Sequence, residues 1–348
     1  MTGDLLRQDA DALVNTVNTA GIMGKGIALQ FKRAWPEMFR EYEAACARGE
    51  VRLGHMHVWN TGSLTPPRFI VNFPTKKHWR SRSRLADVQS GLDDLVRVIG
   101  DLGLTSIALP PLGCGNGGLA WVDVEPLIHR GLASVADHVD IRVFAPDGAP
   151  DAKSMVNREK PPPLNPTRSA MLALMHAYVQ FTFAPPTLVE VQKLAYFLQL
   201  SGQDLNMEFT PHIYGPYADA LRRALSAMEG HYITGFGDGS ARVADAVGID
   251  VLPEAVQQVE DYVADHPETA ARISAVMEEI AGFESAYGLE LLASVHWVMA
   301  HDDAARNDLT AAHTAVRQWS KRKSTLFTRQ HVERAWHTLR DRGLVAAS

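Results

Sequence analysis

The sequence predicts a mixed α/β domain over residues 1–146, followed by a mainly α-helical domain over residues 168–348. Strand-like apolar segments alternate with amphipathic helical segments as far as Phe144. Beyond them, residues 147–167 carry Pro161-Pro162-Pro163 and have the composition of a stiffened linker. The pattern then changes to helical spacing alone, which marks the second domain.

Each element follows from its apolar pattern, with alternation for strands and a recurrence every three or four residues for helices. In an alternating α/β domain, ligands bind at the carboxyl ends of the strands. The expected strands are Ala12–Val17, His55–Asn60, Arg68–Phe73, Ser106–Leu109 and Asp140–Phe144, and the expected helices between them are Lys32–Ala47, Leu85–Leu102 and Val124–Ala136. The second domain is expected to contain helices at Arg168–Phe181, Leu188–Leu200, Tyr217–Met228, Pro253–Asp265, Glu268–Ala281, Gly288–Ala300, Leu309–Ser320 and Thr328–Arg342, the last capped by Thr328.

The composition excludes several classes of protein. The 348 residues are 46% hydrophobic and 21% charged, as in a globular protein, and no apolar run is long enough to span a membrane. Cys46 and Cys114 offer neither a disulfide framework nor a zinc set. We therefore expect a cytoplasmic protein that needs no metal or other cofactor and has no membrane partner.

Acidic residues are concentrated in the second domain. Residues 243–308 include 14 acidic side chains and only two basic ones, Arg272 and Arg306. A solvated helical face accounts for such a stretch. The alternative is a surface that imitates nucleic acid phosphates or that binds a basic partner.

Two glycine loops carry the main functional signal of the first domain. The run Asn15–Ala28 places asparagines and then Gly24 and Gly26 directly before a helical segment, and Gly113–Gly118 follows the apolar run Ser106–Pro111. Glycine lets the backbone approach an anion closely, and a helix N-terminus favours negative charge. Two such loops at strand ends predict a diphosphate held from both sides.

These motifs, with Gly3-Asp4-Leu5 and the run Asn72–Trp79, resemble macrodomains, and most closely those of the DarG antitoxin family. The resemblance covers the first 146 residues or so. It implies a three-layer α/β/α macrodomain with a mixed central sheet, which binds ADP-ribose and removes it from thymine bases in DNA. The ADP-ribose-binding residues that it implies are Asp4, Leu5, Asn18, Gly24, Lys25, Gly26, Ile27, Thr75, Pro111, Gly113, Cys114, Gly115, Asn116, Gly117 and Gly118.

Some of these residues also suit a purely structural role. Asp4 has the position of a turn or helix cap as much as of an adenine ligand. Asn15 suits a structural turn network, and Lys25 a solvated surface position. Cys114 has no His or Asp at a spacing that would activate it, so we expect a small loop residue.

Lys76 is the expected catalytic residue, because it follows Phe73-Pro74-Thr75 at a strand end and should project over the cleft. Partial burial and the cations that follow it should both lower the pKa of its amine. The amine would then attack C1 of the distal ribose, or its ammonium form would protonate the departing base. In related terminal ADP-ribose glycohydrolases an Asp of the second loop assists the lysine. Here Gly117 takes that place, which weakens the covalent route.

The segment after Lys76 has the composition of a single-stranded DNA contact. Lys77, His78, Trp79 and Arg80 combine phosphate-neutralising cations with an aromatic ring on which a base can stack. A basic surface loop stapled by Trp79 is the structural alternative. His78 is either a proton shuttle or a ring packed beside Trp79.

The second domain resembles the Panacea-type helical domain of the same antitoxins through Val191–Phe197 and Phe209–Tyr217. That resemblance implies binding of a DarT-type toxin, and the acidic stretch would then occupy the toxin's basic DNA channel. Tyr214–Tyr217 suits a packing turn as well as a contact site. Two other functions fit the first domain: a hydrolase for protein-linked or O-acetyl ADP-ribose, and a non-catalytic reader. Macrodomains have a strand before this Gly-Asp-Leu motif, and only Met1 and Thr2 precede Gly3. We therefore expect either a very short first strand or a chain that starts late.

Overall fold

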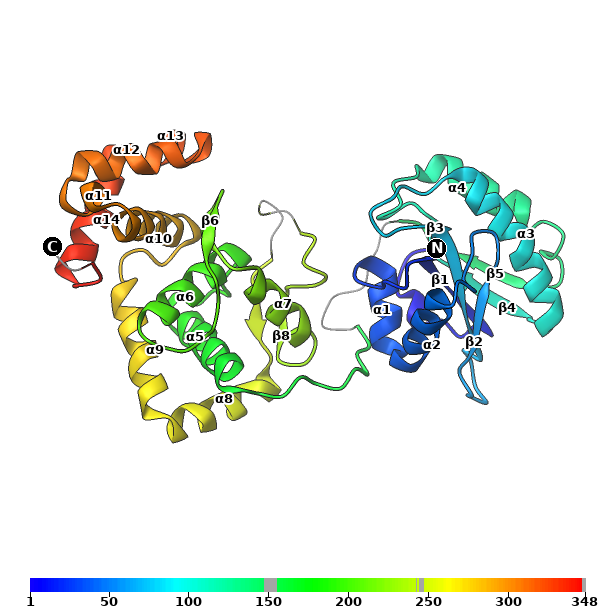
Figure 1. Ribbon diagram of the computed structural model, residues 1–348. Coiled ribbons are helices and arrows are strands. Elements are labelled where there is room, and N and C mark those ends of the chain that lie inside the picture. The colour runs from blue at the N-terminus through cyan, green and yellow to red at the C-terminus, as the bar shows by residue number, and fades with distance from the viewer. Residues whose placement is uncertain (147–154, 242, 244–246, 346–348) are drawn as a thin grey trace. The chain divides into compact units, whose positions relative to one another are not determined.

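The computed structural model describes residues 1–146, 155–241, 243 and 247–345. Its contacts divide the chain into two compact units, Met1–Lys160 and Pro161–Ser348 (Figure 1). Residues 147–154 of the expected linker lie outside the described residues.

Unit 1 is built on a five-stranded sheet in the order β2-β3-β1-β4-β5. β2 runs antiparallel to β3, whereas the other neighbours are parallel, so the predicted mixed sheet is confirmed. The order brings β1 to the centre, between β3 and β4. The strands are β1 (Ala12–Asn18), β2 (His57–Asn60), β3 (Phe69–Lys76), β4 (Ser106–Leu109) and β5 (Asp140–Val143).

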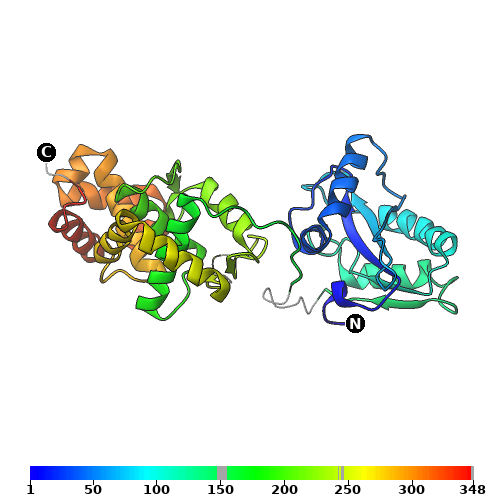
Figure 2. The same ribbon diagram turned by 90° about the horizontal axis from the view of Figure 1, so that it is seen from below.

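Helices cover both faces of this sheet, as the three-layer prediction requires (Figures 1 and 2). Side chains of a strand point alternately to its two faces. Ala12 and Val14 of β1 join the core with α3 and α4, whereas Leu13 and Val17 join the core with α1 and α2. These helices are α1 (Gly26–Ala34), α2 (Pro36–Ala47), α3 (Leu85–Leu102) and α4 (Trp121–Gly131).

The prediction of a single helix over Lys32–Ala47 was wrong. Two helices, α1 and α2, meet at Trp35, whose φ of -133° is not helical. Pro36 is the cause, because its ring disfavours a helical conformation in the preceding residue while fitting the first turn of a new helix. α1 itself begins earlier than expected, at Gly26 directly in the first glycine loop.

Unit 2 is mainly helical (Figure 1), and most residues of α10 are buried in its core. Apolar side chains on all sides of α10 explain its burial, since such a helix has no face suited to water. Its helices are α5 (Pro166–Thr182), α6 (Leu188–Leu200), α7 (Asp219–Met228), α8 (Pro253–Asp265), α9 (Pro267–Glu279), α10 (Ala286–His301), α11 (Asp303–Asn307), α12 (Leu309–Trp319), α13 (Lys321–Leu326) and α14 (Arg329–Asp341).

The sequence prediction missed the shortest elements of unit 2. α11 and α13 are five and six residues long, too short for a periodic apolar pattern. The paired strands β6 (Thr210–His212) and β7 (Gly215–Tyr217) and the paired strands β8 (Ile233–Thr234) and β9 (Asp250–Val251) were missed for the same reason. The predicted cap is confirmed, because the Thr328 hydroxyl accepts a hydrogen bond from the backbone N–H of His331.

Candidate active site

The carboxyl ends of β1, β3 and β4 bring the predicted residues of unit 1 together. Asn18 and Lys76, the last residues of β1 and β3, are direct partners in the strand register. The backbone N–H of Thr19 donates to the Lys76 and Lys77 carbonyls at 3.1 and 3.2 Å, which fixes the loop after β1 to the end of β3. The second glycine loop follows β4, the other neighbour of β1.

Lys76 is buried, with 9% of its surface exposed, and its amine reaches the second glycine loop. Its Nζ donates to the Asn116 carbonyl oxygen at 2.7 Å. Burial lowers the pKa of this amine, because a charged form loses water solvation. The cations that follow Lys76, which we expected to contribute to that lower pKa, are not its cause. Lys77 is exposed.

Asn116 also lies where the two glycine loops meet. A Cβ placed on Gly26 would stand 3.2 Å from the side-chain Nδ2 of Asn116. Gly26 begins α1, and Gly24, Lys25 and Ile27 flank it. The structure therefore places the buried amine, the first loop and the second loop around one residue.

Glycine is required at three positions of the second loop. Gly113 has a φ of 74° and Gly118 a φ of 73°, in the left-handed region that favours glycine. A Cβ on Gly117 would come within 3.0 Å of both the Gly113 carbonyl oxygen and the Ser83 Oγ. The loop in this conformation has no room for a side chain at 117, so a carboxylate cannot be accommodated where the related glycohydrolases have Asp.

Cys114 has the properties of a packed loop residue. Its Sγ donates weakly to the Leu112 carbonyl at 3.7 Å, and burial raises the pKa of its thiol to about 11. A thiol with so high a pKa is protonated at neutral pH and is a poor nucleophile. Pro111 accepts a hydrogen bond from the Cys114 N–H at 3.1 Å, and Gly115 has open space where its Cβ would be.

The Asn18 amide is used within its own loop. Its Oδ1 accepts from the Ala20 N–H at 2.9 Å, and its Nδ2 donates to the Ile22 carbonyl. The buried Tyr42 hydroxyl donates to the Asn18 carbonyl. Sequence reasoning missed Tyr42, which holds the end of β1 from α2.

Asn15 is a buried strand residue and not part of a turn network, so that expectation was wrong. Its Nδ2 donates to the Asn72 Oδ1 at 2.9 Å across the β1–β3 pair. On the same pair of strands, the Thr75 hydroxyl donates to the Val17 carbonyl at 3.3 Å. Both side chains therefore tie β1 to β3 beneath the site.

Asp4 adopts the capping arrangement that the sequence left open. Its Oδ1 accepts from the Leu6 N–H at 2.9 Å, and its Oδ2 lies 3.4 Å from Arg7 Nε. It caps a short 3-10 helix, η1 (Leu5–Arg7), in which the Leu5 side chain is buried in the core. These contacts are with chain neighbours and not with the glycine loops.

The residues expected to contact DNA lie on the surface after β3. The His78 and Trp79 rings stack with centroids 5.4 Å apart, and the Arg80 guanidinium lies 4.4 Å from the Trp79 centroid. His78 is therefore packed beside Trp79, one of the two arrangements expected for it. Trp79 keeps 42% of its surface exposed.

Arg82 and Ser83, next to this segment, are site residues that sequence reasoning missed. The Ser83 N–H donates to the Gly117 carbonyl at 2.9 Å, and Arg82 Nη2 donates to the Gly118 carbonyl at 3.3 Å. Gly113 and Gly117 were the only signal in the sequence for this contact. A glycine leaves space beside the backbone, and here the Ser83 side chain fills it.

The resemblance motifs of unit 2 are mostly structural. Lys193 of α6 is 1% exposed and donates to the Pro216 carbonyl at 2.6 Å. Gly215 has a φ of 91° and packs against Lys193 and Ser294. These contacts favour the packing-turn interpretation of Tyr214–Tyr217.

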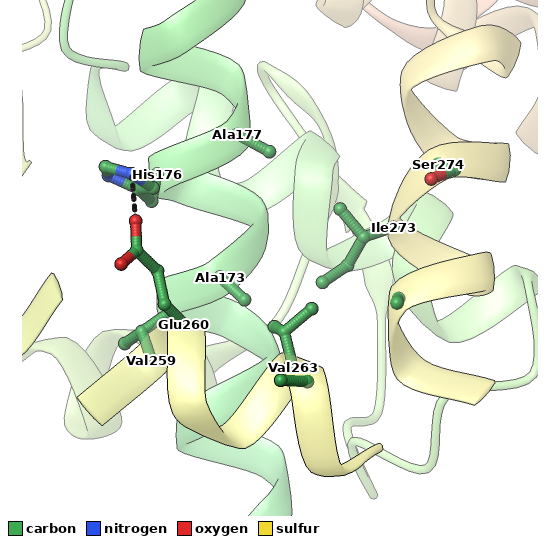
Figure 3. A pocket seen from close by; sticks show the side chains of 10 residues that line it. Ala173, His176, Ala177, Val259, Glu260, Val263, Ile273 and Ser274 are labelled. Atoms are coloured by element: carbon green, nitrogen blue, oxygen red, sulfur yellow. Dashed lines mark ion pairs between the residues drawn. The ribbon is translucent and has the colours of Figure 1, made fainter. Parts of the chain in front are cut away.

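An apolar groove of about 390 Å³ lies between α5, α8 and α9 of unit 2 (Figure 3). Ala173, Val263 and Ile273 are among its lining residues. At its rim, His176 Nε2 lies 4.0 Å from Glu260 Oε1. Glu260 is the acidic residue of this lining. The exposed acidic side chains of α8 and α9 are Glu254, Glu260, Asp261, Asp265, Glu268 and Glu278.

Comparison with known proteins decides the family. The Macro domain family matches residues 14–128. A DNA ADP-ribosyl glycohydrolase of Thermus aquaticus is 44% identical over 341 residues, which cover 98% of this chain and 92% of that protein. The chain belongs to the DarG family of DNA ADP-ribosyl glycohydrolases.

Two further similarities bear on a DarG-family chain. The solved macrodomain of Mycobacterium tuberculosis DarG is 56% identical, covers 42% of this chain and 96% of its own, and has a TM-score of 0.42. A DNA ADP-ribosyl transferase–DNA ADP-ribosyl glycohydrolase fusion protein of Thermosipho africanus is 31% identical over 159 residues, which are 41% of this chain and 40% of the fusion. Within the described part of the chain, no helix is long and apolar enough to cross a membrane.

Proposed function

We propose that unit 1 hydrolyses the N-glycosidic bond between ADP-ribose and thymidine in single-stranded DNA. The single observation that carries this proposal is the contact of the buried Lys76 amine with Asn116, beside Gly26 of the first loop. An amine is thereby held where the two diphosphate loops meet. The full-length relative named as a DNA ADP-ribosyl glycohydrolase supports the same reaction.

The glycine loops would bind the diphosphate of ADP-ribose. The N-terminus of α1 would present the positive end of a helix dipole to the diphosphate. The second loop meets this N-terminus at Asn116, whose side-chain Nδ2 would lie 3.2 Å from a Cβ built on Gly26. Asn18 would meet the distal ribose only by exchanging hydrogen bonds within its loop, since its amide is engaged there.

Lys76 would act on the scissile carbon or on the departing base. In the reaction the bond from ribose C1 to thymine nitrogen breaks, water supplies a hydroxyl group to C1, and thymine gains a proton. The lowered pKa makes a neutral amine accessible for attack on C1. Because position 117 has no room for a carboxylate, that route would lack the assistance found in related glycohydrolases. Protonation of the departing base by the ammonium needs no such group.

Single-stranded DNA would bind at the surface after β3. Trp79 and His78 offer stacked rings, and Lys77 and Arg80 offer positive charge, close in sequence to Lys76. A thymine must leave a duplex to place its sugar bond in a pocket, so an unpaired strand is the favoured substrate.

Replacement of Lys76 tests the catalytic proposal. We expect Lys76→Ala to reduce hydrolysis of an ADP-ribosylated thymidine oligonucleotide by a factor of at least about 100, the range typical of a lost acid or nucleophile. ADP-ribose affinity, measured by calorimetry, should persist because the loops remain. Lys160→Ala, a change at an exposed lysine outside the proposed site, is the matched control and should retain turnover at saturating oligonucleotide.

Unchanged turnover in Lys76→Ala would refute the assignment. A wild-type protein that binds ADP-ribose without releasing it from DNA would instead support the reader function. Release from protein or from O-acetyl ADP-ribose, with none from DNA, would support the other hydrolase.

We also propose that unit 2 binds and neutralises a DarT-type toxin through α8 and α9. Exposed carboxylates on these helices can imitate the phosphates of DNA in a basic channel, and the groove beside them offers apolar contact. A relative whose name joins a DNA ADP-ribosyl transferase to the glycohydrolase supports this pairing of functions. Glu290 is excluded from the surface because Lys323 and Arg322 pair with it inside the core.

Charge reversal tests this surface. The double variant Glu260→Lys and Asp261→Lys should weaken toxin binding at least about tenfold, measured by calorimetry, because like charges would face the channel. Glu333→Lys, an exposed change on α14, should leave binding unchanged. Equal loss in both variants would show that net charge alone, and not this surface, determines binding.

A further inference from the structure

The segment between β3 and α3, residues 77–84, is attached at both ends to the second glycine loop. Directly before it, Lys76 Nζ donates to the Asn116 carbonyl at 2.7 Å. Near its end, the Ser83 N–H donates to the Gly117 carbonyl at 2.9 Å and Arg82 to the Gly118 carbonyl at 3.3 Å. Both ends of the β3–α3 segment are therefore hydrogen-bonded to three consecutive residues of the loop, Asn116, Gly117 and Gly118.

Ser83 acts as a buried spacer in this attachment. It is 6% exposed, although residues 77–82 are exposed. Its Cβ would stand 3.1 Å from a Cβ built on Gly113, and its Oγ within 3.0 Å of one built on Gly117. The buried Oγ has no hydrogen-bond partner in the described part of the chain, so packing and the backbone bond give Ser83 its role. A shift of Ser83 must move the loop.

The middle of the same segment carries the surface that would contact DNA. His78, Trp79 and Arg80 are exposed and stacked on one another, and the Ser81 N–H donates to the His78 carbonyl at 2.9 Å. This internal hydrogen bond and the two attached ends leave the segment few ways to bend. A DNA strand bound at residues 78–80 would therefore displace the two ends of the segment.

We propose that Arg82 and Ser83 are positioning residues that couple DNA contact to the geometry of the diphosphate loop and Lys76. This inference rests on the proposed hydrolysis of DNA-linked ADP-ribose. It assigns to the β3–α3 segment a part in turnover as well as in affinity. A thymidine within a strand should consequently be released faster, at saturation, than the same ADP-ribosylated thymidine as a free nucleoside.

The ratio of the two kcat values tests the coupling. In the wild type we expect kcat for an ADP-ribosylated oligonucleotide to exceed kcat for ADP-ribosylated thymidine by about tenfold, since small misplacements of reacting groups have effects of this size or larger. Ser83→Val replaces the hydroxyl by a methyl group and adds a second methyl group beside Gly113 and Gly117, and should bring the ratio close to one. Arg82→Gln, at an exposed side chain, should lower the ratio without any risk to folding.

Ser81→Val is the matched control, because it makes the same change at an exposed position of the segment, and it should keep the wild-type ratio. A wild-type ratio of one, or an unchanged ratio in both Ser83→Val and Arg82→Gln, would overturn the coupling while hydrolysis itself stands. A wild-type protein that releases ADP-ribose from neither substrate would overturn the proposed function as well.

Discussion

Buried lysines have different roles in the two units. The Lys76 amine donates to Asn116 of the second glycine loop, whereas Lys193 is enclosed by α6, α10 and the β6–β7 pair. Burial, and next the charge of Lys323, lower the pKa of Lys193 to about 7, although Glu290 opposes this. A lowered pKa alone does not identify a catalytic lysine, so the proposal for Lys76 depends on its position at the strand ends.

The pKa of Lys193 predicts how stability depends on pH. An unfolded lysine titrates near 10.4, so between about pH 7 and 10 the unfolded state holds a proton that the folded state has released. The free energy of unfolding of the wild type therefore rises with pH in this window. Lys193→Met removes that contribution, and the stability of the variant relative to the wild type should fall by up to about 1.4 kcal/mol per pH unit from pH 7 to 9.

Urea unfolding of the full chain at several pH values measures this difference. Lys321→Met, at an exposed lysine, serves as the control and should show no such trend. A pH-independent difference for Lys193→Met would mean that Lys193 remains charged in the folded state.

At the scale of single elements, the second glycine loop depends on packing as well as on backbone freedom. Gly117 has no positive φ, yet the Gly113 carbonyl and Ser83 exclude a Cβ from it. Gly115 is free of such neighbours. Packing therefore requires glycine at position 117 but not at position 115, although both belong to the same motif.

Gly117→Ala should destabilise the protein by about 1–3 kcal/mol, the usual cost of overpacking, and should weaken ADP-ribose binding because the loop must shift. Gly115→Ala should leave the melting temperature close to that of the wild type. Thermal unfolding and calorimetry compare the two variants. Equal melting temperatures for Gly117→Ala and the wild type would show that the loop relaxes at no cost.

At the scale of the whole molecule, each unit has its own hydrophobic core. The described core residues of unit 1 form two clusters on the two faces of the sheet, and those of unit 2 form one cluster around α10. The proposed activities are divided in the same way, with hydrolysis in unit 1 and toxin binding in unit 2.

Separation of the chain after Lys160 should preserve both activities. We expect residues 1–160 to fold and to hydrolyse ADP-ribosylated oligonucleotide, and residues 161–348 to fold and to bind the toxin, because neither core loses its members. Circular dichroism, turnover and calorimetry on the two fragments test this. Loss of turnover in a folded 1–160 fragment would show that unit 2 contributes to catalysis.

The sequence alone determined the class of fold and the neighbourhood of the site. Strand and helix periods and glycine spacing are local properties, so Leu85–Leu102 and Ser106–Leu109 were predicted at their observed bounds. Pro36, equally local, was the signal that the predicted single helix overlooked.

Only the tertiary structure decided which polar atoms meet. Lys76 and Asn116 are 40 residues apart, and Ser83 reaches a loop that follows a different strand. Such contacts depend on how β1, β3 and β4 align through the packing of the whole core, which no local pattern records. The same holds for Asn15, whose side chain donates to Asn72 across the β1–β3 pair.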